Sequence, residues 1–349
     1  MKAVFAIPGD RHRRTGGFIY ESTVLDRLRA LGHWIEHLQL CRDAYPDPAP
    51  ADIAETLRLL QGVPAEVPLI LDGFIPGCAG ADVLARISAP IVPIIHHPLG
   101  LETGLPPGRA AHLLQSERDA LVHTAHIIVP SPHTGQILQD RFGVAPERLT
   151  IASPGFDTVP LPKVPVDPPL ILAIGLLAKR KGHDVLIDAL SRLTDLAWQA
   201  RIVGGTHDQR VTDALHAQVD RLALSDRVTF VGILGDRGIA TAFAEASIFA
   251  LATRYEGYGI VFGEAMQNGL PIVSCDGGAV ADTVGPAGDV VAVDDPAAFA
   301  EAIRRLLTDP DHYRHRAGAS AARGRALPTW TDTAATIADA VDRHARVRP

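Results

Sequence analysis

The feature that most constrains the fold is an alternation of short apolar runs with segments of helical spacing. Residues 2–8 read KAVFAIP, a buried-strand pattern, and residues 18–33 place apolar side chains at helical spacing up to Gly32. The alternation continues through VPLILDGF, APIVPIIHHP and IIVPS, with helices expected around residues 117–126 and from His133 to Phe142. Short strands that alternate with helices predict a parallel sheet covered by helices in an α/β fold.

A proline-dense segment divides this alternation in two. Residues 153–169, SPGFDTVPLPKVPVDPP, follow neither the helical nor the strand period, which is typical of a linker. A second series begins at PLILAIG and runs through WQARIVGG, RVTFVGIL, SIFALAT, PIVSC and GDVVAVDD. A chain of 349 residues is long enough for two domains. We therefore expect Rossmann-like domains over 1–160 and 161–327, with a terminal helical segment over 328–349.

Charge and cysteine content exclude several classes of protein. The net charge of -7 argues against a nucleic-acid binder that is held by phosphate contacts. Cys41, Cys78 and Cys275 are isolated, so neither a disulfide framework nor a zinc knuckle is indicated. The first apolar run is too short for a signal peptide, and no run of 18 apolar residues occurs. We expect a cytoplasmic protein, with peripheral contact at the inner face of the membrane left open.

A basic cluster follows the first strand of the second series. Open α/β sheets bind ligands at the carboxyl ends of their strands, and the loop LLAKRKGHD places Lys179, Arg180 and Lys181 at such an end. Asp184 is expected to cap the helix that follows. Cationic side chains beside a helix start favour a phosphate group, and a solvated surface loop is the alternative interpretation.

The stretch RYEGYGIVFGEAMQNGLP combines two acids with closely spaced glycines. Glu256 lies in the turn after SIFALAT, and Gly257 and Gly259 let the backbone approach a ligand without interference from a Cβ. A helix is expected from about Ile260 to residue 268. Glu264, one turn into it, can accept hydrogen bonds from two vicinal hydroxyls. The alternative, that both acids only complement the helix dipole, explains Glu264 but not a glutamate placed before two glycines.

The first half offers weaker signals. Gly16 and Gly17 are expected at a helix N-terminus after the first strand. His96 and His97 end another strand, where a histidine can polarise or hydrogen-bond a substrate, although a structural role is the alternative for any one of 15 histidines. Three arginines of the first loop either contact an anionic acceptor or lipid surface or are simply solvated: Arg11, Arg13 and Arg14.

Several common sites are missing from the sequence. No G-x-G-x-x-G follows the first strand of either half, which disfavours an NAD(P)-dependent dehydrogenase. Neither a G-x-S-x-G elbow nor a Walker A loop is present, which disfavours hydrolases and P-loop NTPases. No set of three metal ligands with the usual spacing is seen, so no metal is expected.

Taken together, GLLAKRKG and EGYGIVFGEAMQNGLPIV resemble the retaining glycosyltransferases of family 4, which carry an E-x7-E signature followed by E-A-M-x-x-G-x-P. The resemblance implies a GT-B fold of two facing Rossmann-like domains with a cleft between them and a C-terminal helix that crosses back to the first domain. It further implies transfer of a hexose-type sugar from a nucleotide-diphosphate sugar, without metal or cofactor. The donor would bind mainly to the C-terminal domain and the acceptor mainly to the N-terminal domain.

The resemblance also assigns roles to individual residues. Lys181 would bind the donor diphosphate, Glu256 would lie against the transferred sugar, and Glu264 would bind the ribose. His96 would act near the anomeric centre, with His97 a close second. Glycines and backbone amides would approach the phosphates or the sugar at Gly16, Gly17, Gly257, Tyr258, Gly259 and Ile260.

One departure concerns the diphosphate. The family commonly has an arginine where this chain has Leu176. Either Arg180 supplies the second cation, or Lys181 and backbone amides hold the diphosphate without it.

The acceptor stays open between a glycan, a lipid-linked glycan and a small molecule. Two other functions also remain: a non-hydrolysing sugar-nucleotide epimerase of GT-B fold, and a non-catalytic sugar-binding protein.

Overall fold

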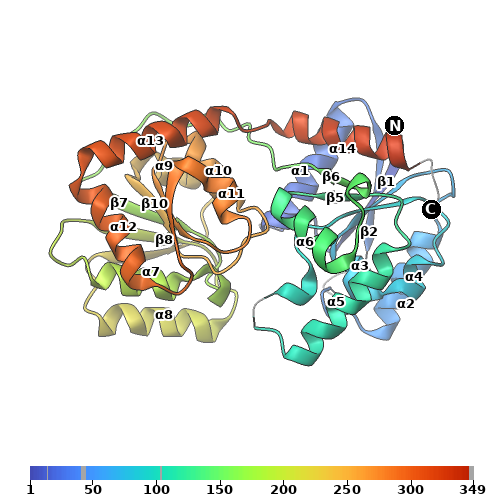
Figure 1. Cartoon of the computed structure of the whole chain (residues 1–349), viewed down its shortest axis with the longest axis horizontal. Helices are drawn as coiled ribbons and strands as arrows, with labels where there is room; N and C mark the ends of the chain where they lie inside the picture. Colours follow the sequence, from blue (N-terminus) through green and yellow to red (C-terminus); the bar gives the residue numbers. More distant parts are fainter. Residues whose placement is uncertain (14, 41–44, 103, 346–349) are drawn as a thin grey trace. The chain divides into compact units, whose positions relative to one another are not determined.

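The computed structural model describes residues 1–13, 15–40, 45–102 and 104–345. It divides into two compact units, Met1–Gly155 with Pro328–Pro349, and Phe156–Leu327. The division after Gly155 lies at the start of the proline-dense segment, a few residues before the boundary expected from the sequence. Each unit is a parallel sheet with flanking helices (Figure 1).

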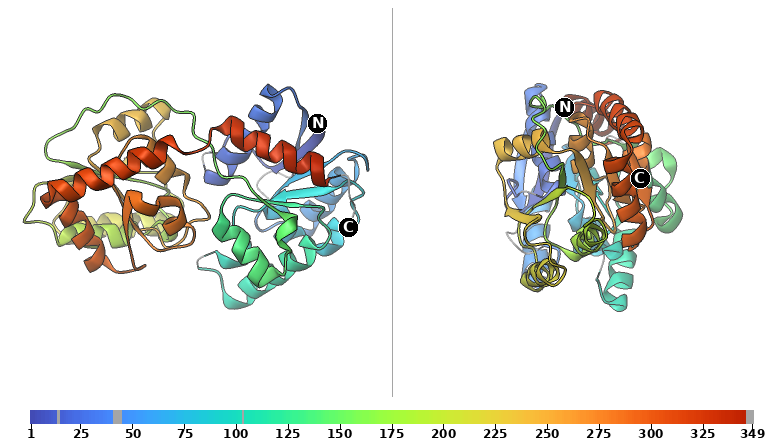
Figure 2. Two further views of the ribbon diagram at one scale, coloured as in Figure 1. Left: turned by 45° about the horizontal axis from the view of Figure 1, so that its top comes forward. Right: turned by 90° about the vertical axis from the view of Figure 1, so that its left-hand side faces the viewer.

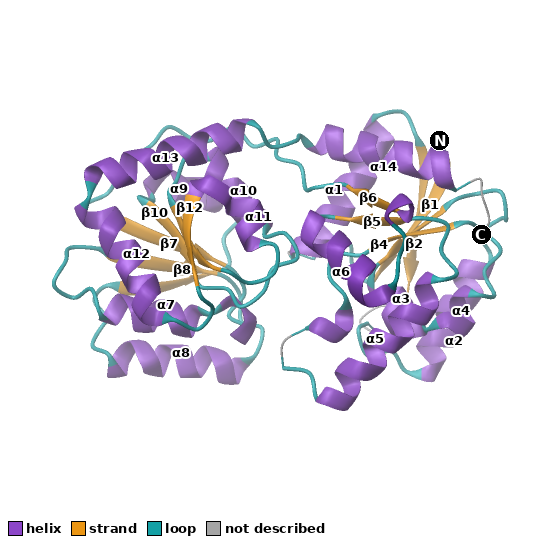
Figure 3. Cartoon of the chain, in the orientation of Figure 1, coloured by secondary structure: helices purple, strands orange, loops and turns teal. Residues whose placement is uncertain are grey.

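The first unit is built on a parallel sheet that has the strand order β2-β1-β3-β4-β5-β6 among the described residues. Figure 3 draws the strands in orange and the helices that flank them in purple. The strands are β1 Lys2–Pro8, β2 Trp34–Leu40, β3 Leu69–Asp72, β4 Ile91–Ile94, β5 Ile127–Val129 and β6 Leu149–Ile151. The helices are α1 Gly16–Ala30, α2 Pro50–Gln61, α3 Phe74–Ala79, α4 Ala81–Leu84, α5 Pro107–Leu121, α6 Pro132–Phe142 and α14 Trp330–His344, with short 3₁₀ turns at Leu99–Leu101 and Pro146–Arg148.

The second unit repeats this plan with the strand order β12-β11-β10-β7-β8-β9. Its strands are β7 Leu170–Ile174, β8 Gln199–Val203, β9 Val228–Gly232, β10 Ile248–Leu251, β11 Ile272–Cys275 and β12 Gly288–Val291. Its helices are α7 His183–Ser191, α8 Gln209–Arg221, α9 Asp236–Glu245, α10 Ile260–Gln267, α11 Val280–Val284, α12 Pro296–Thr308 and α13 Pro310–Arg325, with 3₁₀ turns at Lys179–Lys181 and Gly285–Ala287.

Both faces of the second sheet are buried. One hydrophobic cluster joins it to α7, α8 and α12 and includes Leu186, Leu215 and Phe299. The cluster on the other side joins it to α9, α10 and α11 and includes Phe243 and Phe262. A strand that is covered on both faces reads as a continuous apolar run, which explains why SIFALAT and PIVSC lack alternation.

Helix α14 returns the C-terminal segment to the first unit. Thr333 Oγ1 donates a hydrogen bond of 2.7 Å to the Ser153 carbonyl, and the Trp330 ring meets the Tyr20 ring edge-on at 5.6 Å. Ile337 and Val341 on the same helix are fully buried. The red helix α14 accordingly lies beside α1 in both Figures 1 and 2.

One helix differs in extent from the expectation. The helix expected around residues 117–126 is the C-terminal part of α5, which begins at Pro107 and ends at Leu121. Pro107 at its first position fixes a backbone angle that suits a helix start. No described helix is both long and apolar enough to span a membrane.

Candidate functional site

The loops that follow β7 and β10 lie next to each other because these two strands pair in the middle of the second sheet. The first loop carries Arg180 and Lys181, and the second carries Glu256. The Lys181 Nζ donates a hydrogen bond of 2.6 Å to Glu256 Oε1. The topology of the sheet therefore joins the basic cluster to the first acid of the E-x7-E stretch.

Glu256 is a buried carboxylate that accepts several hydrogen bonds. Thr253 Oγ1 donates to Oε1 at 3.0 Å, and Arg180 Nη1 lies 3.4 Å from Oε2. Burial alone would raise the pKa of Glu256, but the charges of Lys181 and Arg180 outweigh it and hold the pKa below its ordinary value. Glu256 is therefore a carboxylate at neutral pH, and two cations stand at its oxygens.

Arg180 is the other cation of this loop that contacts Glu256. Its Nη1 donates to the Tyr255 carbonyl at 2.8 Å as well as reaching Glu256. Leu176 lies two residues beyond the end of β7, and its carbonyl lies 3.2 Å from His183 Nε2. Arg180 and Lys181 thus both reach the carboxylate of Glu256.

The loop after β7 is held by a buried histidine and a left-handed glycine. His183 Nε2 lies within hydrogen-bonding distance of both the Gly175 and the Leu176 carbonyl. Gly182 has φ +64°, and a Cβ there would stand 1.8 Å from the Ala252 carbonyl oxygen. Only glycine fits this close approach of the two loops.

Asp184 does not cap α7 as expected. The N-cap residue is Gly182, which has no side chain to accept a hydrogen bond from the first turn. The Asp184 carboxylate instead forms a two-point ion pair with Arg254, at 2.9 and 2.7 Å. This pair ties the start of α7 to the loop after β10, because a guanidinium group matches a carboxylate in shape.

Helix α10 begins at Ile260, directly after the left-handed Gly259, which has φ +85°. Tyr258 is fixed just before it, since its carbonyl accepts a hydrogen bond of 2.8 Å from Thr283 Oγ1. A Cβ at Gly263 would stand 2.0 Å from the Phe156 ring, so this glycine lets the linker pack on the helix. Gly257 and Gly259 lie in the turn between Glu256 and this helix start.

Glu264 lies half-buried, one turn into α10. Burial raises the pKa of its carboxyl group to about 7, and the charge of Asp236 adds to the effect. A carboxylate in this state gains stability when ligand hydroxyls donate hydrogen bonds to it.

The first unit places His96 at the end of β4, over the N-terminal turn of α1. A Cβ added to Gly17 would stand 3.4 Å from the His96 ring, so the ring packs on the glycine backbone. Helix α1 begins at Gly16 after Thr15, as expected for the glycine pair. The His96 side chain is 26% exposed, whereas both ring nitrogens of His97 are buried. The geometry therefore favours His96 over His97 as the histidine that meets a ligand.

Two buried acids beside His96 were missed in the sequence. Glu21 of α1 is fully buried, and its Oε1 lies 3.3 Å from His96 Nε2. Asp72, the last residue of β3, is also buried. Asp72 ends the strand-like run VPLILD, and a carboxylate at the carboxyl end of a strand indicates a candidate functional residue. Nothing in the helical pattern of α1 distinguishes Glu21 from an exposed residue.

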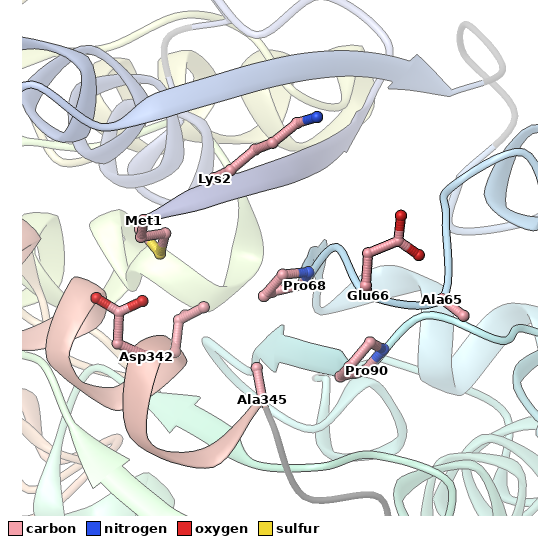
Figure 4. Close-up of a pocket in the computed structure, with 9 residues that line it drawn as sticks. Met1, Lys2, Ala65, Glu66, Pro68, Pro90, Asp342 and Ala345 are labelled. Atoms are coloured by element: carbon pink, nitrogen blue, oxygen red, sulfur yellow. The ribbon is translucent and has the colours of Figure 1, made fainter.

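A cavity of about 730 Å³ lies at the opposite edge of the first sheet (Figure 4). Its lining includes Lys2, Pro68 and Pro90, which lie at the amino ends of β1, β3 and β4. Ligands of open α/β sheets bind at the carboxyl ends, so we assign no role to this cavity.

A smaller cavity of about 340 Å³ lies at the carboxyl ends of β1 and β2. Arg11 lines it and is paired with Asp26 at 2.9 Å. Arg14 and Cys41 lie outside the described residues. Over the part of the chain that the structure describes, no three or more His, Cys, Asp or Glu side chains are arranged to hold a metal ion.

Two family models match this chain. "Glycosyltransferase Family 4" matches residues 23–159, and "Glycosyl transferases group 1" matches residues 168–309. The two matches follow each other along the chain, one in each unit.

Curated relatives agree with these matches. The mannosylfructose-phosphate synthase of Agrobacterium fabrum is 29% identical, over 44% of this chain and 38% of its own length. The MMP alpha-(1->4)-mannosyltransferase of Mycolicibacterium hassiacum is 27% identical over 83% of this chain and 74% of its own length. The chain also matches the D-inositol 3-phosphate glycosyltransferase of Xylanimonas cellulosilytica, over 54% of that protein's length, so it spans between about a third and about half of the length of this relative and of the synthase.

Solved structures show the same fold. The sucrose-phosphate synthase of Thermosynechococcus elongatus superposes with a TM-score of 0.83 at 21% identity, over 98% of both chains. Anabaena HepE in complex with UDP-glucose gives a TM-score of 0.80 at 18% identity, over 98% of this chain and 100% of its own. With two six-stranded parallel sheets among the described residues and family matches in both units, this chain belongs to the GT-B glycosyltransferases of family 4.

Proposed function

We propose that the chain transfers a hexose-type sugar from a nucleotide-diphosphate sugar to an acceptor hydroxyl, with retention at the anomeric carbon and without a metal ion. The observation that carries this proposal is the meeting of Lys181 and Arg180 at Glu256, with α10 beginning four residues later along the chain. This arrangement provides cations, a buried carboxylate and a helix N-terminus within one pair of adjacent loops.

Each part of this arrangement suits one part of the donor. The diphosphate would bind Lys181, with Arg180 beside it, and the amides at the start of α10 would add hydrogen bonds from Gly257 to Ile260. Glu256 would accept hydrogen bonds from the sugar hydroxyls. Glu264, farther along α10, would accept them from the ribose, as its position in the E-x7-E spacing implies.

The chemical demand of the reaction agrees with these residues. Cleavage of the glycosyl–phosphate bond leaves negative charge on the departing nucleoside diphosphate. Lys181 and Arg180 are already held in place by Glu256, so the cations need little reorganisation to meet that charge. A preorganised cationic loop can stabilise a leaving group as a divalent ion does, which supports the metal-independent form of the proposal.

The acceptor would bind mainly to the first unit. His96, whose ring is partly exposed above Gly17, would contact the sugar near the reacting carbon, and a leaving-group phosphate oxygen would take the proton of the acceptor hydroxyl. Retention follows when that hydroxyl attacks from the face that the diphosphate leaves. Glycans, lipid-linked glycans and small molecules all remain acceptor classes, and the cytoplasm, with its reducing conditions, is the proposed location.

A ligand panel tests the donor. Thermal unfolding of the full chain is followed with UDP, GDP, ADP and their glucose and mannose conjugates, with and without EDTA. We expect one base to stabilise the protein, since a ligand at about 100 times its Kd contributes roughly 2.7 kcal/mol. Stabilisation that persists in EDTA supports binding without metal.

The selected donor is then incubated with acceptor mixtures, and nucleoside diphosphate release is measured. Release that depends on an acceptor, with a product of unchanged anomeric configuration by NMR, is the expected result. Interconversion of the donor sugar without acceptor identifies an epimerase instead. Binding without turnover across the panel identifies a sugar-binding protein, and loss of all turnover in EDTA with recovery in Mn²⁺ contradicts the metal-independent mechanism.

A further inference from the structure

Two carboxyl groups lie side by side beneath His96, and no step of the proposed reaction uses them. Glu21 projects from α1 and is 0% exposed, and Asp72 ends β3 and is 5% exposed. Strand β3 pairs with β4, which leads to His96, and Asp72 is in register with Ile94. Three elements of the first unit thus bring two acids to one histidine.

The contacts of these acids leave one position unfilled. Glu21 Oε1 lies 3.3 Å from His96 Nε2, while Glu21 Oε2 is buried without a hydrogen bond from the described residues. Asp72 Oδ1 accepts the Phe74 N–H at 2.7 Å. The side chains of Glu21 and Asp72 interact with each other, so a proton on Asp72 would supply the missing donor.

Two dry carboxylates in contact cannot both be ionised. Burial raises the pKa of Glu21 to about 8, and burial together with the Glu21 charge raises the pKa of Asp72 well above its ordinary value, so the pair holds a single proton above about pH 8. The two groups titrate as a coupled pair, because ionisation of one carboxyl group raises the free energy needed to ionise the other.

We propose that Glu21 and Asp72 are positioning residues for His96: the pair holds one shared proton, and Glu21 Oε1 accepts the Nε2–H of a neutral imidazole. This inference rests on the proposed function for the importance of His96, and it specifies how that residue is prepared. Asp72 O–H donates to Glu21 Oε2, so both oxygens of Glu21 are satisfied. Fixing the proton on Nε2 leaves the Nδ1 lone pair of His96 to accept a hydrogen bond from a substrate hydroxyl.

The surroundings of His96 support a single ring orientation. Gly17 packs against one face of the ring, and the Tyr20 ring meets it edge-on at 5.1 Å. Tyr20 stays neutral, because burial and the Glu21 charge raise its pKa, and its hydroxyl donates to the Ala152 carbonyl at 2.7 Å. Among the described residues, the titratable groups next to the ring are therefore Glu21, Asp72 and Tyr20, of which Tyr20 is neutral. Burial lowers the pKa of His96, which keeps the imidazole neutral.

The first test needs no substrate. Long-range ¹H–¹⁵N spectra of the full chain labelled with ¹⁵N-histidine report which ring nitrogen carries the proton, and the His96→Gln variant assigns the signal. We expect a neutral Nε2–H tautomer with a slowly exchanging proton at pH 9, above the pKa of about 8 to which burial raises Glu21. Glu21→Met should remove that slow exchange, whereas Glu21→Gln should keep it, because its amide oxygen still accepts from Nε2–H while its NH₂ donates to Asp72.

Glu117→Met is the matched control. Glu117 is also fully buried in the first unit, but its contacts are with α3 and the turn at Leu99 rather than with His96. The control should leave the His96 signal unchanged even if it lowers the melting temperature. A wild-type Nδ1–H tautomer, or slow exchange that survives in Glu21→Met, would overturn the inference.

The second test separates positioning from stability. With UDP-glucose or GDP-mannose, whichever the ligand panel identifies as donor, Glu21→Met should lower kcat at least 10-fold with the donor KM changed less than 3-fold. In a His96→Gln background the same substitution should cost less than 2-fold, because there is no imidazole left to position. If Glu21→Met lowered kcat equally in the wild-type and the His96→Gln backgrounds, Glu21 would have only a structural role. A wild-type chain without any turnover would end the proposed function and leave the spectra to decide this inference.

Discussion

Lys181 is the residue on which the donor site depends most directly. Its ammonium group lies 2.6 Å from Glu256 and is only 14% exposed, so it is held at the end of β7 rather than moving freely in solvent. We expect Lys181→Ala to weaken binding of the nucleoside diphosphate by 10- to 100-fold, because a charge-assisted hydrogen bond contributes about 1.5 to 3 kcal/mol. Isothermal titration with the diphosphate from the ligand panel measures this loss.

The control for this change lies two residues away. Lys179 is exposed in the same loop, so Lys179→Ala removes the same net charge without removing a contact to Glu256. Its affinity should stay within 3-fold of the wild type. Equal losses in the two variants would show that only the overall charge of the loop matters.

Glu264 gives a pH dependence of donor binding. Its pKa of about 7 means that the carboxylate form, which would accept two hydrogen bonds from ribose hydroxyls in the proposed donor site, gains population as the pH rises from 6 to 8. The affinity for a nucleotide sugar should therefore rise over this range, and Glu264→Gln should abolish the rise. A nucleotide sugar is used as the probe because its diphosphate is esterified at both ends and does not titrate there. A Glu264→Gln variant with the wild-type slope would assign the titration to another group.

The residues found from the sequence and those missed differ in a physical way. Glu256 and Lys181 stand in loops with glycines and charges that a buried core would not contain, so their pattern predicts a site without any knowledge of packing. Glu21 is on a helix where polar residues are common, and only the packing of β3 and β4 against α1 shows that it is buried. His183 was missed for the same reason, since its two carbonyl partners come from the strand end that folds back over it.

At the scale of elements, Gly182 joins the 3₁₀ turn Lys179–Lys181 to helix α7, and this connection sets the position of the cationic side chains. Gly182 has φ +64°, and its Cα faces the Ala252 carbonyl of the loop after β10. Gly182→Ala would force these loops apart, and we expect a loss of about 3 kcal/mol or more in the free energy of unfolding, together with weaker donor binding. Urea denaturation and the ligand panel measure the two effects.

Gly232→Ala separates the two causes of that loss. Gly232 has φ +76° in the same unit, but a Cβ there would meet nothing within 4 Å. It should cost about 1 kcal/mol from backbone strain alone and leave donor binding unchanged. If Gly182→Ala lowered the free energy of unfolding no more than Gly232→Ala does, the close approach to Ala252 would not contribute to stability.

The order of strands and helices was largely predictable, but the extent of the helices was not. Runs such as SIFALAT and PIVSC have only one compact solution, a strand buried on both faces, and they appear as β10 and β11. Helix α5 extends from Pro107, well before the expected start, because its first turns carry few apolar residues and Leu113 is the first one that is buried. Strand β2 buries only Ile35 and Leu40 fully, and its sequence, WIEHLQL, carries polar residues, which is why it gave no clear signal.

At the scale of the whole molecule, buried ionisable groups make stability depend on pH. Glu117 is fully buried in the first unit, and burial raises the pKa of its carboxyl group to about 8, with the Leu99 N–H offsetting part of the shift. The folded state therefore holds the proton more tightly than the unfolded state, whose carboxyl pKa is about 4.3. The contribution to stability is fully present below that unfolded value and is lost as the pH rises through about 8.

Glu117→Gln removes this titration while keeping the shape of the side chain. We expect the wild type to equal or exceed the variant in free energy of unfolding near pH 5, and the variant to be the more stable near pH 9, since an ionised Glu117 would be buried without a cation. Urea denaturation at a series of pH values, followed by tryptophan fluorescence that includes Trp330, whose ring meets that of Tyr20 in the first unit, measures the crossing. Glu55→Gln is the exposed control, because Glu55 is paired with Arg58 at the surface. Parallel curves for wild type and Glu117→Gln from pH 5 to 9 would show that the carboxyl group reaches water in the folded protein, and the same curves would then weaken the case for a dry carboxyl pair at Glu21 and Asp72 in the same unit.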